Sequence, residues 1–302
     1  MSFWHETPAI NELSFGPELD QYFMTFKEKA EYKGPFDRQG VPLLDYRGKI
    51  GRQYNPIAIA QYGLGCLNVF LSLNDKEYLN KAIVVADWLV DNLEKNNHGL
   101  YCWHHKFDWE YFRVLKAPWY SGLAQGVGIS FLLRMGKYSK KKSYMDSVEK
   151  AFKTLITPIE EGGCLHIDKD KNWWIEEYIT SPPTHILNGF IWALWGVYDY
   201  YKETGYIDAK NLFDRSLKTL TQNLHRYDCG YWSLYDLSPL KIQNVASPFY
   251  HKLHLVQLDV MSRLTGDNLF KNYFKTWSEY QNNKTNRVKA LLKKAIFKVK
   301  YF

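Results

Sequence analysis

The sequence predicts a mainly α-helical protein: an incomplete α/α toroid of about four helix pairs, with short β-hairpins and an N-terminal arm. A block that combines proline with aromatic or amide residues recurs at 54–63, 117–126, 183–189 and 248–257. Its prolines lie roughly 60–65 residues apart, a period typical of stacked supersecondary units. Each block is predicted to open a helix, because proline in the first turn loses no hydrogen bond. A second amphipathic segment follows each block, and pairs of this kind curve into a ring.

The elements follow in a regular order. Residues 1–53 form the arm, in which 36–46 reads as a short strand or hairpin. The toroid is expected over 54–283, with helices at 56–73, 76–94, 119–136, 142–157, 184–202, 208–224, 249–264 and 267–281. Glycine turns and short extended segments follow the first three pairs. The helices that begin at the repeated block carry Gly and Ala and are expected inside, so their polar first turns meet at one end of an open groove.

The tail, 284–302, is expected to be a separate basic amphipathic helix. Its apolar residues fall on one helical face, and lysine and arginine cover the rest. Two interpretations remain open. The helix lies on an anionic membrane, or it caps the toroid with a solvated charged face. The apolar residues are Val288, Leu291, Leu292, Ala295, Ile296 and Val299.

Composition narrows the partners. The formal charge of +7 favours an acidic partner, and no nucleic-acid-binding module is recognisable, so nucleic acid is not expected. The four cysteines form no C-x-x-C pair, which argues against a zinc site. The first residues do not resemble a signal peptide, and no stretch is expected to span a bilayer. We therefore expect a cytoplasmic protein whose tail can touch the inner membrane.

Two adjacent acids, Glu176 and Glu177, stand between tryptophans and a tyrosine in the loop before the third block. In an extended segment neighbouring side chains face opposite ways, so one acid would face the groove and the other solvent. A carboxylate against aromatic rings has a raised pKa and can act as a general base near neutrality. The alternative is a pair of solvated acids beside core tryptophans.

Several blocks resemble the C-terminal domain of the D-glucuronyl C5-epimerases. They are 176–178 with 187–190, 119–126, 59–64, 235–237, and Tyr250-His251 with His254 and Gln257. The match runs from about Tyr54 to Gln281, in order and at compatible spacing. The resemblance implies an α/α toroid that turns D-glucuronate into L-iduronate within heparosan-type polymers.

The resemblance also implies roles for residues. Glu177 and Tyr250 would take part in proton transfer, and Tyr178 and Tyr235 would lie at or beside the reacting sugar. A further tyrosine on an N-terminal hairpin would be Tyr46 or Tyr54. The family carries a basic residue shortly after the block at 235–237, where this chain has Ser238-Pro239-Leu240, so another residue would have to contact the substrate carboxylate.

Polar and aromatic groups in the first turns of the repeated helices are further candidates for substrate contact. For the amides, hydrogen bonding to loops between helices remains the alternative, and for the aromatic residues, filling of the core. His251 and His254 lie three apart on one helical face with no third metal ligand placed by the sequence, so they are expected to contact a uronate carboxylate. The candidates are Tyr54, Gln61, Tyr62, Trp119, Tyr120, Gln125, Asn188, His251 and His254.

The function expected is therefore a uronate C5-epimerase that acts inside an acidic polysaccharide. A base on one face of C5 removes the proton and an acid on the other face returns one, which requires neither a metal nor a redox cofactor. A polysaccharide lyase that works by β-elimination and a non-catalytic glycan-binding toroid stay open as alternatives. An open arc could also pair with a second copy as a homodimer.

Overall fold

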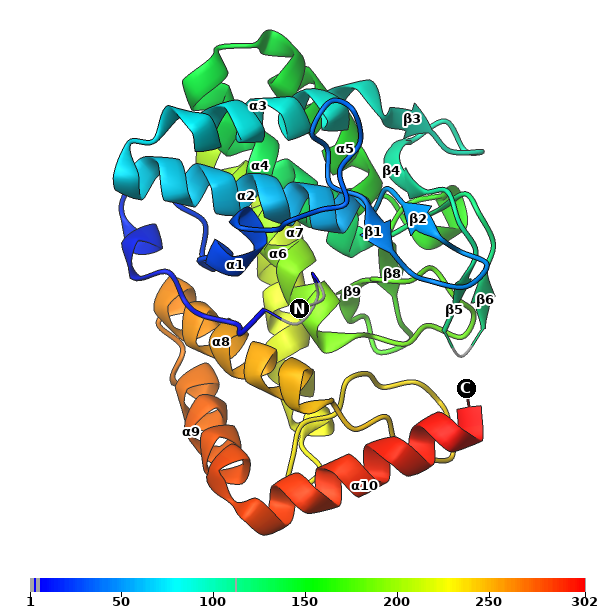
Figure 1. Ribbon diagram of the computed structural model, residues 1–302. Helices are drawn as coiled ribbons and strands as arrows, with labels where there is room; N and C mark the ends of the chain where they lie inside the picture. Colours follow the sequence, from blue (N-terminus) through cyan, green and yellow to red (C-terminus); the bar gives the residue numbers. More distant parts are fainter. Residues whose placement is uncertain (1–2, 4–5, 112, 302) are drawn as a thin grey trace.

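The computed structural model describes residues 3, 6–111 and 113–301, and it shows the expected α/α toroid (Figure 1). The helices of the four pairs are α2 (Pro56–Leu73) with α3 (Lys76–Asp91), α4 (Gly122–Ser139) with α5 (Lys142–Ile156), α6 (Leu187–Thr204) with α7 (Ile207–Asn223), and α8 (Pro248–Thr265) with α9 (Asn268–Asn282). A short helix, α1 (Lys27–Ala30), lies in the arm, and α10 (Lys284–Tyr301) ends the chain. Single 3-10 turns are Glu12–Phe15, Ile159–Glu161 and Leu224–Tyr227.

The inner helices α2, α4, α6 and α8 pack side by side, and each outer helix packs against its inner partner. Small residues explain the closest approach, between α4 and α6. A Cβ on Gly126 would lie 2.5 Å from the Cα of Ala193, and one on Gly196 would meet the backbone of Gly126. The two helices therefore touch through their backbones, as the glycines of the inner set led us to expect.

Two of the four prolines open their helices as predicted. Pro56 and Pro248 occupy the first turns of α2 and α8. The other two do not: Pro118 precedes a short strand, and Pro183 lies four residues before α6. In α4 the side chain of Ser121 caps the helix instead, by accepting a hydrogen bond from the backbone of Ala124.

Short antiparallel strands lie before the first helix pair and between the first three pairs. They are β1 (Leu44–Asp45) with β2 (Arg52–Gln53), β3 (Leu93–Lys95) with β4 (Tyr101–His105) and β7 (Trp119–Tyr120), β5 (Trp109–Glu110) with β6 (Val114–Leu115), and β8 (Leu165–Ile167) with β9 (Trp173–Ile175). In the last hairpin Leu165 pairs with Ile175 and Ile167 with Trp173.

The N-terminal arm spans the gap between the first and last pairs (Figure 1). Glu12 forms an ion pair with Arg263 of α8 at 2.5 Å, and the Tyr22 backbone donates to Asn68 of α2 at 2.9 Å. Tyr22 and Phe23 also pack on Trp195 of α6. The arm therefore closes the ring that four helix pairs leave open.

Helix α2 is long and apolar enough to span a membrane by length and composition, contrary to the expectation from the sequence. Most of its length is buried inside the fold, and its apolar character is explained by this position.

Candidate active site

A cavity of about 280 Å³ opens where the inner helices begin. Each inner helix contributes a residue to its wall, together with hairpin loops and the arm. The wall includes Asn55 and Gln61 at α2, Leu123 of α4, Asn188 and Trp192 of α6, and Phe249, Tyr250 and Leu253 of α8. Polar first turns therefore meet at one end, as the repeat predicts.

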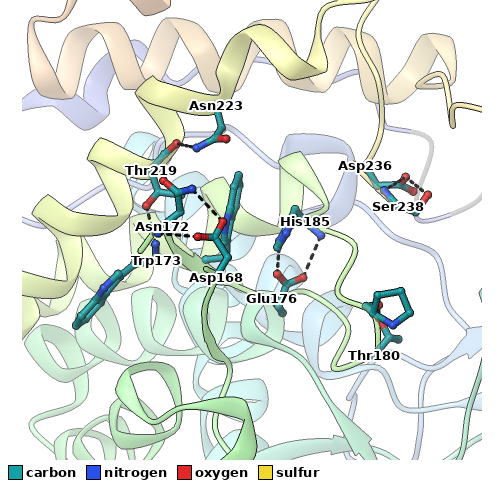
Figure 2. A network of polar contacts seen from close by, with 12 residues as sticks. Asp168, Asn172, Trp173, Glu176, Thr180, His185, Thr219, Asn223, Asp236 and Ser238 are labelled. Carbon is teal, nitrogen blue, oxygen red and sulfur yellow. Dashed lines mark hydrogen bonds and ion pairs between the residues drawn. The ribbon is translucent and has the colours of Figure 1, made fainter. Parts of the chain in front are cut away.

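The β8–β9 hairpin holds the acidic loop in place. At its turn, Asp168 accepts hydrogen bonds from Asn172 and from the indole of Trp174 at 3.0 Å (Figure 2). The backbone of Trp173 donates to Thr219 of α7 at 2.7 Å. The loop that follows β9 is thus anchored to an outer helix just before its two glutamates.

The two glutamates diverge. Glu176 accepts from the backbone of His185 at 3.1 Å, and its Oε1 lies 2.5 Å from Nδ1 of that ring (Figure 2). Glu177 lines the cavity. The expectation that neighbouring side chains face apart is met, but Glu176 is buried against His185 instead of facing solvent.

Glu177 is a buried acid with one oxygen left over. Within the described residues, its Oε2 has no hydrogen-bond partner. Burial raises the pKa of Glu177 to about 8, and the negative charges of Asp236 and Glu176 add to the rise. A carboxyl group with this pKa exchanges a proton near neutral pH, which is what a general base requires.

Two glycines of the repeated blocks make room for this loop. A Cβ on Gly122 would lie 2.6 Å from the carbonyl oxygen of Glu176, which accepts a hydrogen bond from the Gly122 backbone at 2.9 Å. A Cβ on Gly189 would overlap the side chain of Glu177. The starts of α4 and α6 therefore pack closely against the segment that carries the two acids.

Tyr250 lies in the same cavity, on α8. Burial, followed by the charge of Glu177, raises the pKa of Tyr250, so its phenol is protonated at neutral pH. Tyr235 does not line the cavity; its ring packs edge-on against Tyr250 at 4.7 Å. The backbone oxygen of Tyr235 accepts from Leu187 at the start of α6, which ties it to the helix beside Glu177.

Tyr178 completes an aromatic wall. It lines the cavity and packs edge-on against Trp119 at 5.6 Å and Tyr111 at 5.0 Å. The Tyr111 hydroxyl donates to Asp236, a buried carboxylate that also accepts from Asn244 at 2.6 Å. Both oxygens of this second acid accept hydrogen bonds, whereas Oε2 of Glu177 has no partner among the described residues.

The structure distinguishes between the two N-terminal tyrosines. Tyr46, just after β1, lines the cavity, and its hydroxyl accepts from Asn55 at 2.7 Å. Tyr54 is 38% exposed, outside the cavity, and donates to Asp37 at 2.8 Å. The hairpin tyrosine at the site is therefore Tyr46.

Three other predicted ligands also lie in the wall: Gln61, Trp119 and Asn188. Oδ1 of Asn188 is buried and has no partner among the described residues. The indole of Trp119 donates to the Phe107 carbonyl at 2.8 Å, and the ring stacks on His105 at 3.7 Å. Asn188 can therefore receive a hydrogen bond from a ligand, and Trp119 presents a flat face.

Five more of the predicted ligands lie outside the cavity, and three of them contact loops or the arm. Gln125 accepts from the Trp103 backbone at 3.3 Å, and Tyr120 donates to the Gly162 carbonyl at 2.7 Å. Tyr62 packs against Phe36 beneath the arm. Gln125 thus follows the alternative interpretation for the amides, since it hydrogen-bonds a segment between the helices. Tyr120 also hydrogen-bonds a loop, which neither interpretation of the aromatic residues predicts.

The remaining two are the histidines of α8, whose side chains do not line the cavity. Nδ1 of each lies within 2.9 Å of the Ser233 hydroxyl, and Nε2 of His251 lies 3.0 Å from the Trp277 carbonyl. Burial lowers the pKa of both, that of His251 to about 4, so they are neutral. The predicted contact of His251 and His254 with a uronate carboxylate is not supported by this position.

Sequence reasoning missed a cation in the wall. Lys29 of α1 lines the cavity; its ammonium donates to the Phe3 carbonyl at 2.8 Å and lies 3.9 Å from Glu6. Burial lowers the pKa of Lys29 to about 8 and raises that of Glu6 to about 7. Among the described wall residues it is the lone lysine or arginine. No periodic pattern marks it, because the arm lies outside the repeat.

A family model described as "D-glucuronyl C5-epimerase C-terminus" matches residues 95–279, more than half of the chain. The chain belongs to this family. The match contains Glu177, Tyr178, Tyr235 and Tyr250, and it supports a uronate epimerase-type function. It leaves out the arm, and with it Tyr46 and Lys29.

Two known proteins are similar in sequence to about two thirds or more of this chain. The protein MJ1128 of Methanocaldococcus jannaschii is 27% identical over 246 residues, 76% of this chain and 78% of that protein. The D-glucuronyl C5-epimerase of Caenorhabditis elegans is 31% identical over 214 residues, 66% of this chain. The matched region is 34% of the nematode enzyme, so the chain corresponds to about a third of that protein.

Solved structures support the toroid architecture. The family member resembles a D-mannose isomerase, with a TM-score of 0.55, 10% identity, and 90% and 68% of the two chains covered. It also resembles a family 105 glycoside hydrolase of C. acetobutylicum, with a TM-score of 0.50, 14% identity, and 80% and 64% covered. At these identities the likeness describes the fold alone.

Within residues 3, 6–111 and 113–301, no group of three His, Cys, Asp or Glu side chains is placed to hold a metal ion. The described wall of the cavity thus offers two carboxyl groups, several phenols, three amide side chains and one ammonium group for chemistry.

Proposed function

We propose that the protein is a uronate C5-epimerase that converts D-glucuronate to L-iduronate within a heparosan-like acidic polysaccharide. The observation that carries the proposal is that one cavity holds a carboxyl group with raised pKa, Glu177, and a protonated phenol, Tyr250. These residues lie 73 positions apart in the chain, on different elements. The family match supports the same reaction class.

The protonation states assign the roles. Tyr250 holds its proton in the resting protein, so it is the acid, and Glu177 is the base once it is ionised. Glu177 takes the C5 proton, the electron pair passes into the neighbouring carboxylate, and Tyr250 donates a proton to C5 from the other face. The C5–H bond breaks as an O–H bond forms on Glu177, and the new C5–H bond forms as the O–H bond of Tyr250 breaks. One turnover leaves Glu177 protonated and Tyr250 ionised, and proton exchange with water returns both groups to their starting states.

The intermediate carries an extra negative charge on the substrate carboxylate, which a nearby cation stabilises. Lys29 meets this need, since it is the cation of the described wall. Asn188 can hydrogen-bond the sugar through its unpartnered Oδ1. Lys29 would thereby take the place of the basic residue that the sequence lacks at 238–240.

Incubation with heparosan in deuterated water tests the proposal. We expect iduronate that carries deuterium at C5. Glu177→Gln and Tyr250→Phe should each lower its formation by about 100-fold or more, the usual contribution of a general acid or base. Tyr54→Phe is the matched control: this tyrosine lies outside the cavity, so its loss should leave the rate unchanged.

Other results would overturn the assignment. An unsaturated product detected by its ultraviolet absorbance would show a lyase. Binding of the polymer with neither exchange nor inversion would show a glycan-binding toroid. Wild-type rates in both site variants would remove Glu177 and Tyr250 from the mechanism.

A further inference from the structure

Helix α10 is attached to the toroid by one narrow stripe. Ala290 and Phe297 are buried, the Tyr301 hydroxyl accepts from the Ile242 backbone at 3.3 Å, and Lys294 donates to Asn244 at 2.7 Å. Residues 290, 294, 297 and 301 follow the i, i+4, i+7, i+11 spacing of a single helical face. The opposite face is therefore turned away from the body, along the edge of the molecule in Figure 1.

That outward face is apolar. Five large aliphatic side chains on it are between 52% and 89% exposed, and Ala295 between them is exposed as well. In the remainder of the described chain, exposed large hydrophobic residues are scattered or in pairs. A continuous apolar strip of this kind marks an interaction site. The five are Val288, Leu291, Leu292, Ile296 and Val299.

Basic residues border the strip on both sides. At 100° per residue, Arg287 and Lys298 fall on one border, and Lys289, Lys293 and Lys300 fall on the other. The helix contains no aspartate or glutamate. It holds 7 of the 39 basic residues, which leaves 32 in the rest of the chain against 32 acidic residues. The whole formal charge of the protein is thus carried by α10.

We propose that α10 docks the protein on the surface of an anionic lipid bilayer. The outward strip enters the boundary between headgroups and acyl chains, while the bordering lysines extend to the lipid phosphates. A second copy of this helix would fit poorly, because two such strips would bring like charges together with no acid between them. A bilayer supplies both the apolar cover and the negative charge.

Vesicle sedimentation of the full chain tests the proposal. We expect binding to vesicles of phosphatidylcholine mixed with phosphatidylglycerol, much weaker binding to phosphatidylcholine alone, and a fall in affinity as salt increases. Lys298→Gln and Lys300→Gln, one on each border of the strip, should each weaken binding about fivefold, the effect of one basic residue at such a surface. Lack of binding to the anionic vesicles at low salt would overturn the proposal.

A second pair of variants tests the strip itself. The double variant Leu292→Glu/Val299→Glu should lose binding by at least tenfold, since it places carboxylates where the acyl chains would lie. Leu73→Glu is the matched control, because this leucine of α2 is 71% exposed outside the strip and its change should leave binding intact. Leu73, Leu292 and Val299 are all exposed, so these substitutions should not disturb folding. Equal binding by the double variant, or a wild-type dimer that the double variant converts to a monomer, would overturn the bilayer as the occupant.

Discussion

Gly189 leaves room for the carboxyl group on which the proposed chemistry depends. A methyl group there would overlap the Glu177 side chain, so Gly189→Ala should push the carboxyl group aside and lower kcat by about 100-fold, as displacement by an ångström does elsewhere. Alanine favours the helix by roughly 0.5–1 kcal/mol, so helix propensity itself would not reduce stability. Steady-state kinetics with a parallel thermal melt check both points.

Gly136→Ala, near the end of the neighbouring inner helix α4, is the control for this change, because a Cβ there meets nothing within 4 Å. It should leave kcat unchanged. An active Gly189→Ala variant would mean that the position of Glu177 does not matter for turnover.

The raised pKa of Glu177 predicts a pH dependence of activity. If the ionised form is the base, kcat/KM should rise with pH toward about 8. It should fall again at higher pH, because Lys29, whose pKa burial lowers to about 8, then loses its positive charge. The phenol of Tyr250 keeps its proton across this range. A pH–rate profile measures the effect, and a profile that falls as pH increases toward 8 would reverse the assigned roles.

The same group makes stability depend on pH. In the unfolded chain Glu177 ionises near its ordinary pKa of 4.5, whereas in the folded protein it keeps its proton up to about 8. Between these two pKa values unfolding releases a proton from Glu177, so the free energy of unfolding that this group contributes falls as pH rises from about 4.5 to about 8. Glu177→Gln lacks this penalty, so its melting temperature relative to wild type should increase between pH 5 and 8. A constant difference would contradict the raised pKa.

Single-residue features of the site were predictable to a limited degree. Glu177 could be singled out because aromatic residues flank the two adjacent acids in the sequence, and Tyr250 through the resemblance to the epimerase family. The histidines of α8 were misplaced, since Tyr250 and Leu253 face the cavity while His251 and His254, one residue on, lie 100° round the helix. The sequence shows the periodicity but not which stripe faces the ligand.

The inner helices depend on a buried ion pair. Arg134 of α4 and Asp199 of α6 are almost fully buried and lie 2.5 Å apart. Asp199→Asn would leave the arginine buried without its counter-charge, so we expect the free energy of unfolding to fall by about 3–5 kcal/mol. Urea denaturation measures this loss.

The exposed pair of Lys210 and Asp214 on α7 gives the control, at a similar separation of 2.6 Å. Asp214→Asn should change the free energy of unfolding by about 1 kcal/mol or less, because solvent screens that pair. If Asp199→Asn lowered the free energy of unfolding by no more than Asp214→Asn does, the buried pair would not hold α4 to α6.

At the scale of elements, helical periodicity predicted all eight helices of the pairs, most of them to within a few residues. The starts of α4 and α6 were placed three residues too early. Trp119 and Tyr120 pair instead with His105 and His104 of β4, a long-range contact that local pattern does not reveal.

For the molecule as a whole, the arm acts as the closing piece of the ring. Tyr22 is fully buried between α2 and Trp195. Tyr22→Ala should therefore cost about 3–5 kcal/mol of unfolding free energy, as for other large aromatic residues in cores. Leu13→Ala, at a position 66% exposed, should cost little. If urea denaturation showed an equally small loss of unfolding free energy in both variants, the arm would not be needed for stability.

The net positive charge of the protein is unevenly distributed over the molecule. The net charge suggested a polyanion partner at the site, yet α10 accounts for all of it. The part of the cavity wall that the structure describes contains one ammonium group and two carboxyl groups, Glu6 and Glu177. In the proposed mechanism, recognition of an acidic sugar therefore depends on Lys29 and on hydrogen bonds, and the fold rather than the composition brings these groups together.

The most direct test of the proposed mechanism is a crystal structure of the Glu177→Gln variant with a heparosan oligosaccharide. We predict a glucuronate residue in the cavity whose C5 has the amide of residue 177 on one face and the Tyr250 hydroxyl on the other, each within about 3.5 Å. A sugar bound elsewhere, or both groups on the same face of C5, would contradict it.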